Sequence, residues 1–538
     1  MQITRLLILV VLATSLSLEA TAPPHGEERL RELVVFPQMD VSFNWGINFQ
    51  EGHWVINQNV DLSEAIAAQR EDLKRRSDDV EGLMHLAYLL DSNDETNESQ
   101  SCYQEAERLC RHKIAANPQD GLILTELGRV LDESGNKGEA EHCFRKATLI
   151  SSNDWRCWVG LGNFLSSGYF WRMFPSNYCD QILFGKTPSE EVLNYWPTAD
   201  AFNKAESACQ EASQCFDRAV VLAPKEPEVF FQRAGYMSSS NGQACFFRHY
   251  RDFEVINRDK WLLAFSSRET ITNLYQAAEL EPKGCEYLSL AAFFEVLHSA
   301  MESHLNNGRA DSLSEGTKTS IHGAMARLRK ISEDSDKKLA AEAFEDLGML
   351  NVTFDNKPDA IVDFRRAVAL DPTRKQSWDL LLGTLFDSAP PDELLAVAQV
   401  RLKTDDSARN HIVLSKILAQ KMSKWKEAAE QAEIANKLDT NSIVSFLMLG
   451  AIALKQTTDT NGLSVATKYF ANAKNLFDAT SVGVENRKHY REFMLDVAIL
   501  NGVKGTQNGN KVARLLIETI LKNNPNDREA KDILAALN

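Results

Sequence analysis

The side chains that could perform chemistry are scattered along the chain and match no known catalytic pattern. The sequence contains nine Cys and 11 His. Only His142 beside Cys143, and His112 near Cys110, approach the pairing of a nucleophile with a base or of two metal ligands. There is no glycine-rich phosphate loop, no Gly-x-Ser-x-Gly, no His-Glu-x-x-His and no Cys-x-x-Cys. We therefore predict that the protein is not an enzyme and uses no metal ion or cofactor.

The cysteines all lie between Cys102 and Cys285, and their number is odd, so at least one thiol is free or pairs between chains. Within single helices, Cys102 and Cys110 would be about 12 Å apart, and Cys209 and Cys215 about 9 Å apart. Both separations exceed the Cα distance of about 4.4–6.8 Å that a disulfide tolerates. Any disulfide must therefore join different helices. The alternative is that the thiols are small buried groups in the seams between helices.

Aromatic and basic side chains gather in two segments, from about Ser166 to Asp200 and from about Ser238 to Arg268. Aromatic rings with interspersed Arg are the residue types that dominate binding hot spots. We therefore predict a partner-binding surface here, although the rings could equally bury against one another and the rest of the chain. The residues we select are Tyr169, Phe170, Trp171, Phe174 and Trp196 in the first segment, and Arg248, Tyr250, Arg251, Arg258 and Trp261 in the second.

The elements that must position these side chains show a repeated order of residues. Leu127-Gly128 is followed by Ala140, Phe144 and Ala147, and the same order returns as Leu347-Gly348 followed by Ala360, Phe364, Ala367 and Pro372. In both copies the Gly precedes the first Ala by twelve residues. Each copy predicts two amphipathic helices joined by a polar turn. One helix pair leaves an apolar face exposed to water, so neighbouring pairs must stack.

These residues resemble the signature of the tetratricopeptide repeat family, in which Leu-Gly on a first helix is followed by Ala, Phe and a closing Pro on a second. Further copies centre on Gly162 with Phe216 and on Gly450 with Phe470. The resemblance implies an all-α, right-handed superhelical solenoid of about nine or ten hairpins over most of residues 80–538. It also implies a scaffold that binds proteins or peptides.

The two aromatic-rich segments interrupt adjacent repeats at the same place. Gly162 precedes Ala212 by 50 residues and Ala234 precedes Thr270 by 36, where twelve are expected. Both are therefore insertions between a first and a second helix, and we expect them to form loops on the same edge of the solenoid.

The first helices predict a second binding surface, because related repeats often hold extended peptides along them. We expect the residues that flank each Leu-Gly to be exposed there. Relatives that grip a terminal carboxylate use Lys, Asn and Arg at these positions, and only Arg129 and Asn163 fit that pattern. The other flanking residues are Thr125, Val159, Glu345, Met349, Leu447 and Ala451.

The N-terminus has the three parts of a secretory signal: Arg5, an apolar run from Leu6 to Leu18, and small residues at Ala20 and Ala22. We predict an exported protein that is membrane-anchored only if the signal is retained. The predicted organisation is a signal peptide at 1–22 and an extended or hairpin segment at 23–60. A repeat array at 61–300 follows, beginning with a helix near 61–76, then a polar loop at 301–320 and a second array with its cap at 321–538.

The formal net charge of −16 repels nucleic acid and anionic lipid. We therefore predict no nucleic-acid partner and favour a protein or peptide partner, one that a negative field would prefer to be cationic. A protein that binds a small molecule or glycan on stacked aromatic rings is the alternative.

Overall fold

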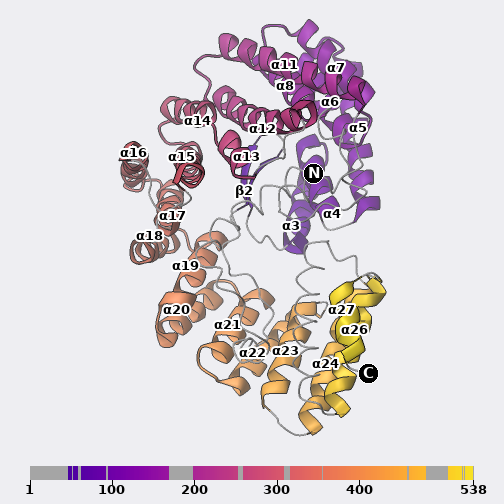
Figure 1. Cartoon of the computed structure of the whole chain (residues 1–538), viewed down its shortest axis with the longest axis vertical. Helices are drawn as coiled ribbons and strands as arrows, with labels where there is room; N and C mark the ends of the chain where they lie inside the picture. The colour runs from indigo at the N-terminus through magenta and orange to yellow at the C-terminus, as the bar shows by residue number, and fades with distance from the viewer. Residues whose placement is uncertain are drawn as a thin grey trace. The chain divides into compact units, whose positions relative to one another are not determined.

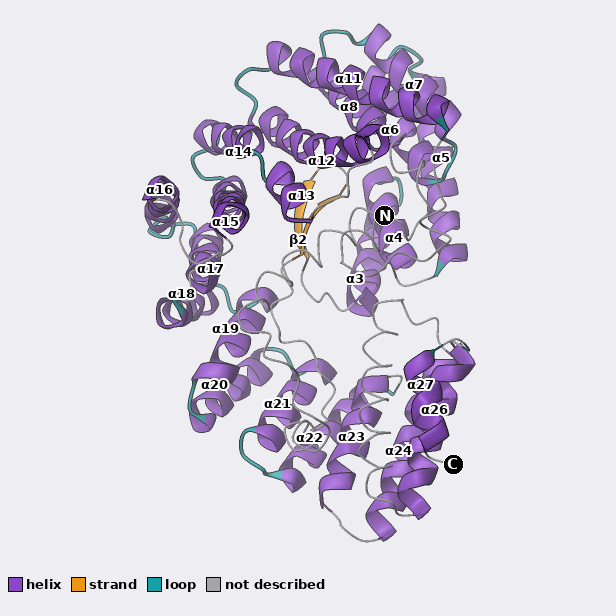
Figure 2. Ribbon diagram, viewed as in Figure 1, coloured by secondary structure: helices purple, strands orange, loops and turns teal. Residues whose placement is uncertain are grey.

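The computed structural model describes residues 46–50, 53–57, 62–92, 95–168, 198–252, 258–307, 315–353, 356–440, 442–456, 460–479, 507–523, 525 and 527–536. Nearly all of these residues are helical, and one strand pair is the exception (Figure 2). The described helices fall into two units, the first ending at Asp371 and the second beginning at Pro372 (Figure 1). We describe each unit by itself.

The first unit contains a strand pair and a series of helices. The strands are β1 (Gly46–Gln50) and β2 (His53–Asn57). The helices are α3 (Leu62–Arg75), α4 (Val80–Ser92), α5 (Thr96–Ala116), α6 (Gly121–Glu133), α7 (Lys137–Ile150), α8 (Trp155–Gly168), α11 (Ala199–Leu222), α12 (Pro227–Asp252), α13 (Arg258–Phe265), α14 (Arg268–Leu280), α15 (Cys285–Asn307), α16 (Glu315–Ile331), α17 (Lys337–Thr353) and α18 (Lys357–Leu370).

The second unit is helical throughout its described residues. Its helices are α19 (Lys375–Ser388), α20 (Pro391–Thr404), α21 (Ala408–Gln420), α22 (Trp425–Leu438), α23 (Ile443–Gln456), α24 (Thr460–Ala479), α26 (Gln507–Asn523) and α27 (Arg528–Ala536).

The strands form an antiparallel hairpin in which Gly46 pairs with Asn57 and Gln50 with His53. The prediction of an extended or hairpin segment is therefore confirmed for residues 46–50 and 53–57. The rest of that segment and the signal sequence lie outside the described residues. Strand β2 contacts α12, so the hairpin belongs to the first unit.

The first helix of a pair packs on the second through a glycine beneath a phenylalanine ring. A Cβ added at Gly348 would lie 2.5 Å from Phe364, and one added at Gly450 would lie 2.6 Å from Phe470. The same arrangement joins α6 to α7 and α8 to α11, at Gly128 with Phe144 and at Gly162 with Phe216. Because only a hydrogen fits beneath the ring, the two helix axes can approach closely. The predicted hairpins are confirmed.

Two further pairs achieve the same packing with other residues. In α19 and α20, Leu382 stands where other pairs have Gly, and Ala398 stands where they have Phe, so the large and small side chains have exchanged helices. In α21 and α22, Ser415 and Ala432 occupy the two positions, and the buried Ser415 hydroxyl donates to the Ala428 carbonyl at 2.7 Å. The exchange in α19 and α20 keeps the summed side-chain volume nearly constant, whereas α21 and α22 place two small residues in the seam.

The polar stretch at 301–320 is not the loop we predicted. Helix α15 extends to Asn307 and α16 begins at Glu315, so only residues 308–314, which lie outside the described residues, separate the two helices. One hydrophobic cluster runs across this stretch, joining Leu288 and Ala292 of α15 to Leu328 of α16 and Leu347 of α17. On α16 the polar residues Glu315, Lys318 and Thr319 are exposed, and the boundary between the units lies at Asp371 instead.

The described cysteines act as small apolar residues. Seven are free thiols, and all seven are buried: Cys102, Cys110, Cys143, Cys157, Cys209, Cys215 and Cys285. Burial raises the pKa of Cys110, Cys209 and Cys215 to about 12, with nearby Glu side chains adding to the effect. The reading of seam thiols is confirmed for these seven. None of the described helices has both the length and the hydropathy that a membrane span requires.

Candidate interaction surfaces

The second insertion forms helices, which corrects the prediction of a loop. Helix α12 continues to Asp252, and the short helix α13 precedes α14, the second helix of the repeat. Two hydrogen bonds hold this extension: the Ser238 hydroxyl donates to the Phe265 carbonyl at 2.8 Å, and Asn241 Nδ2 donates to the Ser267 hydroxyl at 2.9 Å. The predicted site residues of this insertion therefore lie on helices, namely Arg248, Tyr250 and Arg251 on α12 and Arg258 and Trp261 on α13.

The first insertion falls between α8 and α11, where the spacing places it. Helix α8 ends at Gly168, and α11 begins at Ala199 after the cap Thr198, whose side chain accepts from the Ala201 amide. The aromatic residues predicted to bind a partner lie outside the described residues, and for them the prediction stands untested: Tyr169, Phe170, Trp171, Phe174 and Trp196.

Most residues that flank the Leu-Gly positions are buried, contrary to our expectation. Neighbouring first helices pack against one another in the stack, as α6 does with α8 and α15 with α17, and this contact covers them. Arg129 on α6 and Asn163 on α8 are half-buried. The buried flanking residues are Thr125, Val159, Glu345, Met349, Leu447 and Ala451.

A chain of hydrogen bonds instead connects three successive first helices of the first unit. Asn163 Nδ2 on α8 donates to Gln232 Oε1 on α12 at 3.1 Å. Gln232 Nε2 donates to Glu228 Oε1 at 2.6 Å, and the Tyr287 hydroxyl on α15 donates to Glu228 Oε2 at 3.5 Å. The predicted site residue Asn163 thus belongs to a polar surface that spans several repeats.

Glu228 belongs to a row of three carboxylates on consecutive first helices. Glu228 on α12, Glu286 on α15 and Glu342 on α17 each stand six residues before the small residue that packs in the helix seam, which is Ala234, Ala292 or Gly348. Equivalent positions in stacked repeats lie along one face of the array. The row is therefore an acidic surface of the first unit.

Two carboxylates of this row, Glu228 and Glu286, ionise less readily than an ordinary Glu side chain. Burial raises the pKa of Glu228 to about 7, and the negative charge of Glu286 raises it further, while the bond from Gln232 opposes the rise. Burial likewise raises the pKa of Glu286 to about 7, with the charge of Glu342 adding to it. Glu286 is nevertheless accessible to solvent. Removing its neighbour's charge, or supplying a cation, would favour ionisation.

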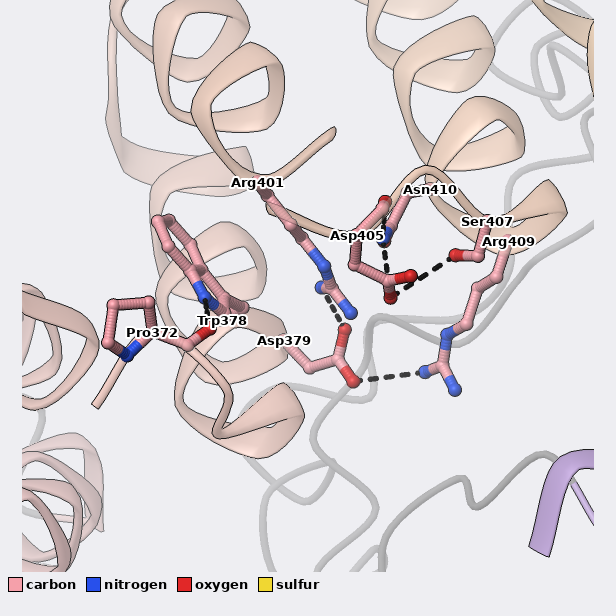
Figure 3. Close-up of polar contacts among 8 residues, drawn as sticks. All are labelled: Pro372, Trp378, Asp379, Arg401, Asp405, Ser407, Arg409 and Asn410. Atoms are coloured by element: carbon pink, nitrogen blue, oxygen red, sulfur yellow. Dashed lines mark hydrogen bonds and ion pairs between the residues drawn. The ribbon is translucent and has the colours of Figure 1, made fainter. Parts of the chain in front are cut away.

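A second charged cluster joins α19, α20 and α21 in the second unit. Figure 3 shows the guanidinium groups of Arg401 and Arg409 both directed at Asp379. Arg401 Nη1 pairs with Asp379 Oδ1, and Arg409 Nη2 donates to Asp379 Oδ2 at 3.1 Å. The Arg401 side chain is only 4% exposed. It replaces the fully buried Ala that other second helices place there, such as Ala367.

Neighbouring turns hold this cluster in place. Trp378 Nε1 donates to the Pro372 carbonyl at 2.9 Å, which fixes the start of α19. Asp405 Oδ2 accepts from Asn410 Nδ2 at 3.0 Å and from the Ser407 hydroxyl at 3.3 Å, which shapes the turn into α21 (Figure 3). Within the described part of the chain, no group of three or more His, Cys, Asp or Glu side chains could hold a metal ion.

Stacked helical hairpins with a recurring glycine–phenylalanine seam define a helical-repeat protein. The family model for the tetratricopeptide repeat matches residues 123–154, which cover most of α6 and all of α7. The hairpin of α6 and α7 is thus a tetratricopeptide repeat, and its glycine–phenylalanine packing recurs at Gly162, Gly348 and Gly450.

Comparison with solved structures finds matches of low sequence identity. Yeast Tom70 is 13% identical over 89% of this chain and 92% of its own, with a TM-score of 0.34. A human IFIT1 dimer with PPP-AAAA is 13% identical over 92% of this chain and 96% of its own, with a TM-score of 0.30. YrrB, a TPR protein with an unusual peptide-binding site, is 14% identical over 38% of this chain and 96% of its own, with a TM-score of 0.27. No curated protein matches the sequence.

Proposed function

We propose that the protein is a non-catalytic scaffold that binds a cationic protein or peptide segment along the first helices of its N-terminal unit. The observation that carries this proposal is the row of Glu228, Glu286 and Glu342 at equivalent positions of three consecutive repeats. Burial raises the pKa of Glu228 and Glu286, and the charge of the next carboxylate in the row raises each pKa further. A bound ammonium or guanidinium group would stabilise the ionised carboxylates and offset both effects. Ionisation of the row is therefore coupled to binding of the cation.

The hydrogen bonds around the row preorganise it. Glu228 is held by Gln232, and Gln232 by Asn163 of the preceding repeat. A side chain fixed before the partner arrives loses less conformational freedom on binding. The aromatic and basic insertions are the proposed source of further partner specificity, since both interrupt repeats next to this surface in sequence.

We further propose that the scaffold works outside the cytoplasm. The apolar run from Leu6 to Leu18, followed by Ala20 and Ala22, supports this location. Mass spectrometry of the N-terminus of the mature protein would test it, because export with processing predicts a chain that begins near residue 23. A mature chain that begins at Met1 would contradict removal of the signal.

The binding proposal is tested with a fluorescein-labelled, lysine-rich peptide and the full chain by fluorescence anisotropy. We expect the double variant Glu286→Gln/Glu342→Gln to weaken binding about tenfold, since each lost charge contact contributes roughly 0.5–1 kcal/mol. A matched control changes two exposed carboxylates of the same unit, Glu279→Gln/Glu333→Gln, with the same change in net charge.

The pH dependence of binding gives an independent readout. Because Glu228 and Glu286 have a pKa of about 7, their ionised fraction rises between pH 6 and pH 8. Affinity for the lysine peptide should rise with it. Equal loss of affinity in both double variants would show a non-specific field effect and contradict a site at this row, as would affinity that falls from pH 6 to pH 8.

A further inference from the structure

The turn between α13 and α14 is held by two successive first helices. Helix α13 packs against both α12 and α15 (Figure 1). From α12, the Ser238 hydroxyl donates to the Phe265 carbonyl at 2.8 Å, and Asn241 Nδ2 donates to the Ser267 hydroxyl at 2.9 Å. From α15, the Phe294 ring stacks on the buried Phe265 ring, with the two centroids 5.5 Å apart. The end of the second insertion is therefore fixed from both sides.

His298 of α15 adds a titratable group to this contact. Its side chain is buried, with 9% of the residue exposed, and the ring donates to the backbone carbonyl of Ser266. The other nitrogen, Nδ1, is also buried and has no hydrogen-bond partner. A neutral imidazole has one donor and one acceptor nitrogen, so the bond to Ser266 uses the donor and leaves the acceptor unpaired. We call this set the insertion latch: Ser238, Phe265, Ser266, Phe294 and His298.

The unpaired Nδ1 atom is unfavourable for stability alone. A buried polar atom without a partner costs free energy, and an apolar side chain of similar volume would fill the same space without that cost. The one change open to a neutral imidazole nitrogen near physiological pH is to take up a proton. That proton would turn Nδ1 into a buried donor with no acceptor, on a ring that now carries a positive charge.

The ionic groups next to His298 are arranged around Arg268 of α14. Arg268 Nη1 lies 2.8 Å from Glu295 Oε1, and Arg268 Nη2 lies 3.8 Å from Glu302 Oε2, so both carboxylates of α15 already face a cation. Burial lowers the pKa of His298, and the charge of Arg268 lowers it further. The bond to Ser266 and the charges of Glu302 and Glu295 oppose that fall. The closed latch therefore disfavours the imidazolium ring.

The other helices around α15 direct their charges to other partners. Asp346 of α17 accepts from Ser289 at 2.6 Å, and Ser289 stands nine residues before His298, on the opposite side of α15. Arg327 of α16 donates to a carbonyl of α14 at 2.6 Å. Lys260 of α13 is exposed. The titratable groups of the helices around the ring are Arg268 and Tyr275 on α14, Glu295 and Glu302 on α15, Arg327 on α16 and Lys260 on α13.

We propose that His298 is a pH switch, which holds the second insertion against α12 and α15 at neutral pH and releases the turn and α13 when it is protonated in acid. Opening the latch exposes the ring to water, where Nδ1 accepts a proton from solvent and both N–H groups find partners. Because the pKa of His298 is lower in the closed form, the latch is at full strength above the ordinary value of 6.5. Its strength is lost as the pH falls below that value.

The switch acts on a different part of the first unit from the acidic row. Ser238 follows Glu228 by ten residues on α12, and His298 follows Glu286 by twelve on α15, which places each about 15–18 Å along its helix from the row. Release would free α13, which carries Arg258 and Trp261 of the predicted partner-binding segment. The insertion would then present these residues in two arrangements selected by pH, and the switch can be tested without any ligand.

Hydrogen exchange of the full chain, read by mass spectrometry at pH 7.5 and pH 5.0 and corrected for the intrinsic rates, tests the switch. We expect protection of residues 258–268 to fall about 3- to 30-fold in acid. A proton taken up only by the open form shifts the equilibrium by up to about tenfold for each pH unit below 6.5. Protection of α17 in the same protein, which should change less than twofold, serves as the internal reference.

The variant His298→Gln keeps an amide that can donate to Ser266 and cannot titrate, so its protection of residues 258–268 should change less than twofold between the two pH values. His322→Gln, which changes an exposed His of α16, is the matched control and should respond as the wild type does. Circular dichroism confirms folding, and if His298→Gln does not fold, the wild-type comparison with α17 decides. The proposal is overturned if wild-type residues 258–268 keep their protection at pH 5.0, if α17 loses protection equally, or if folded His298→Gln keeps the wild-type response.

Discussion

The substitution Glu228→Gln tests the energetics of the acidic row. Burial raises the pKa of Glu228 from an ordinary value of 4.5 to about 7. Each pKa unit corresponds to about 1.4 kcal/mol, so holding this carboxylate ionised above pH 7 costs the fold up to about 3 kcal/mol. Gln cannot ionise, and its amide keeps one oxygen that can accept from Tyr287. Allowing about 1 kcal/mol for the altered bond with Gln232, we expect a net gain of about 1–2 kcal/mol at pH 8.

The sign of the pH dependence follows from linkage. The folded form holds its proton more tightly than the unfolded form, because the folded pKa is the higher one. The stability that protonated Glu228 gives to the folded form is therefore fully present below about pH 4.5 and is lost as the pH rises toward about 7. The wild type and Glu228→Gln should differ little at pH 4.5 and diverge as the pH rises.

Hydrogen exchange read by mass spectrometry measures this effect locally, which suits a chain of two units whose global unfolding need not be two-state. At pH 8, amides of α12 should be about 5- to 30-fold more protected in Glu228→Gln than in the wild type. Comparing both proteins at the same pH cancels the intrinsic exchange rate. Glu279→Gln, an exposed carboxylate on α14, is the matched control. Protection of α12 that is lower in Glu228→Gln than in the wild type at pH 8 would refute the reasoning.

Gly348→Ala should destabilise the α17–α18 pair by about 1–3 kcal/mol, because the new Cβ would lie 2.5 Å from the Phe364 ring. The control Gly323→Ala on α16 meets no atom within 4 Å and should stabilise its helix by up to about 1 kcal/mol. Thermal melts compare the two variants, and equal shifts in melting temperature would contradict the close glycine–phenylalanine packing. Arg401→Leu should unfold at nearly the same urea concentration as the wild type and Arg401→Ala at a clearly lower one, since the apolar side chain fills the buried space; equal losses would show that the charge, and not the volume, matters. Ellman's reagent at pH 8 should leave the seven buried thiols unreacted until urea is added, because the fold shields them from the reagent and burial also raises the pKa of Cys110, Cys209 and Cys215. Rapid native labelling of any of these three would be inconsistent with that burial.

The hairpins that the sequence predicts most clearly are those whose seams use the commonest pair of side chains. Gly348 beneath Phe364 is visible as a motif because the same two residue types recur at equivalent positions of other pairs, such as Gly128 with Phe144. The pair formed by α19 and α20 does not show this motif, because Leu382 and Ala398 exchange the large and small positions. Packing conserves volume across the seam, whereas a motif records residue type.

The candidate sites were harder to predict than the fold. Positions next to Leu-Gly were expected to be exposed, but packing between neighbouring first helices buries residues such as Val159 and Leu447. Glu228, Glu286 and Glu342 lie near the start of each repeat, and aligning the repeats on their small seam residues would have revealed them. The cluster of Asp379, Arg401 and Arg409 depends on contacts among three helices, which no spacing along the sequence encodes.

Hydrogen exchange of the wild-type chain with and without a saturating lysine-rich peptide tests the central claim most directly. A scaffold that binds along its first helices predicts added protection at residues 227–232, 285–290 and 341–346 together, because stacked repeats present these segments on one face. Protection confined to a single repeat, or found only in the second unit, would contradict the account.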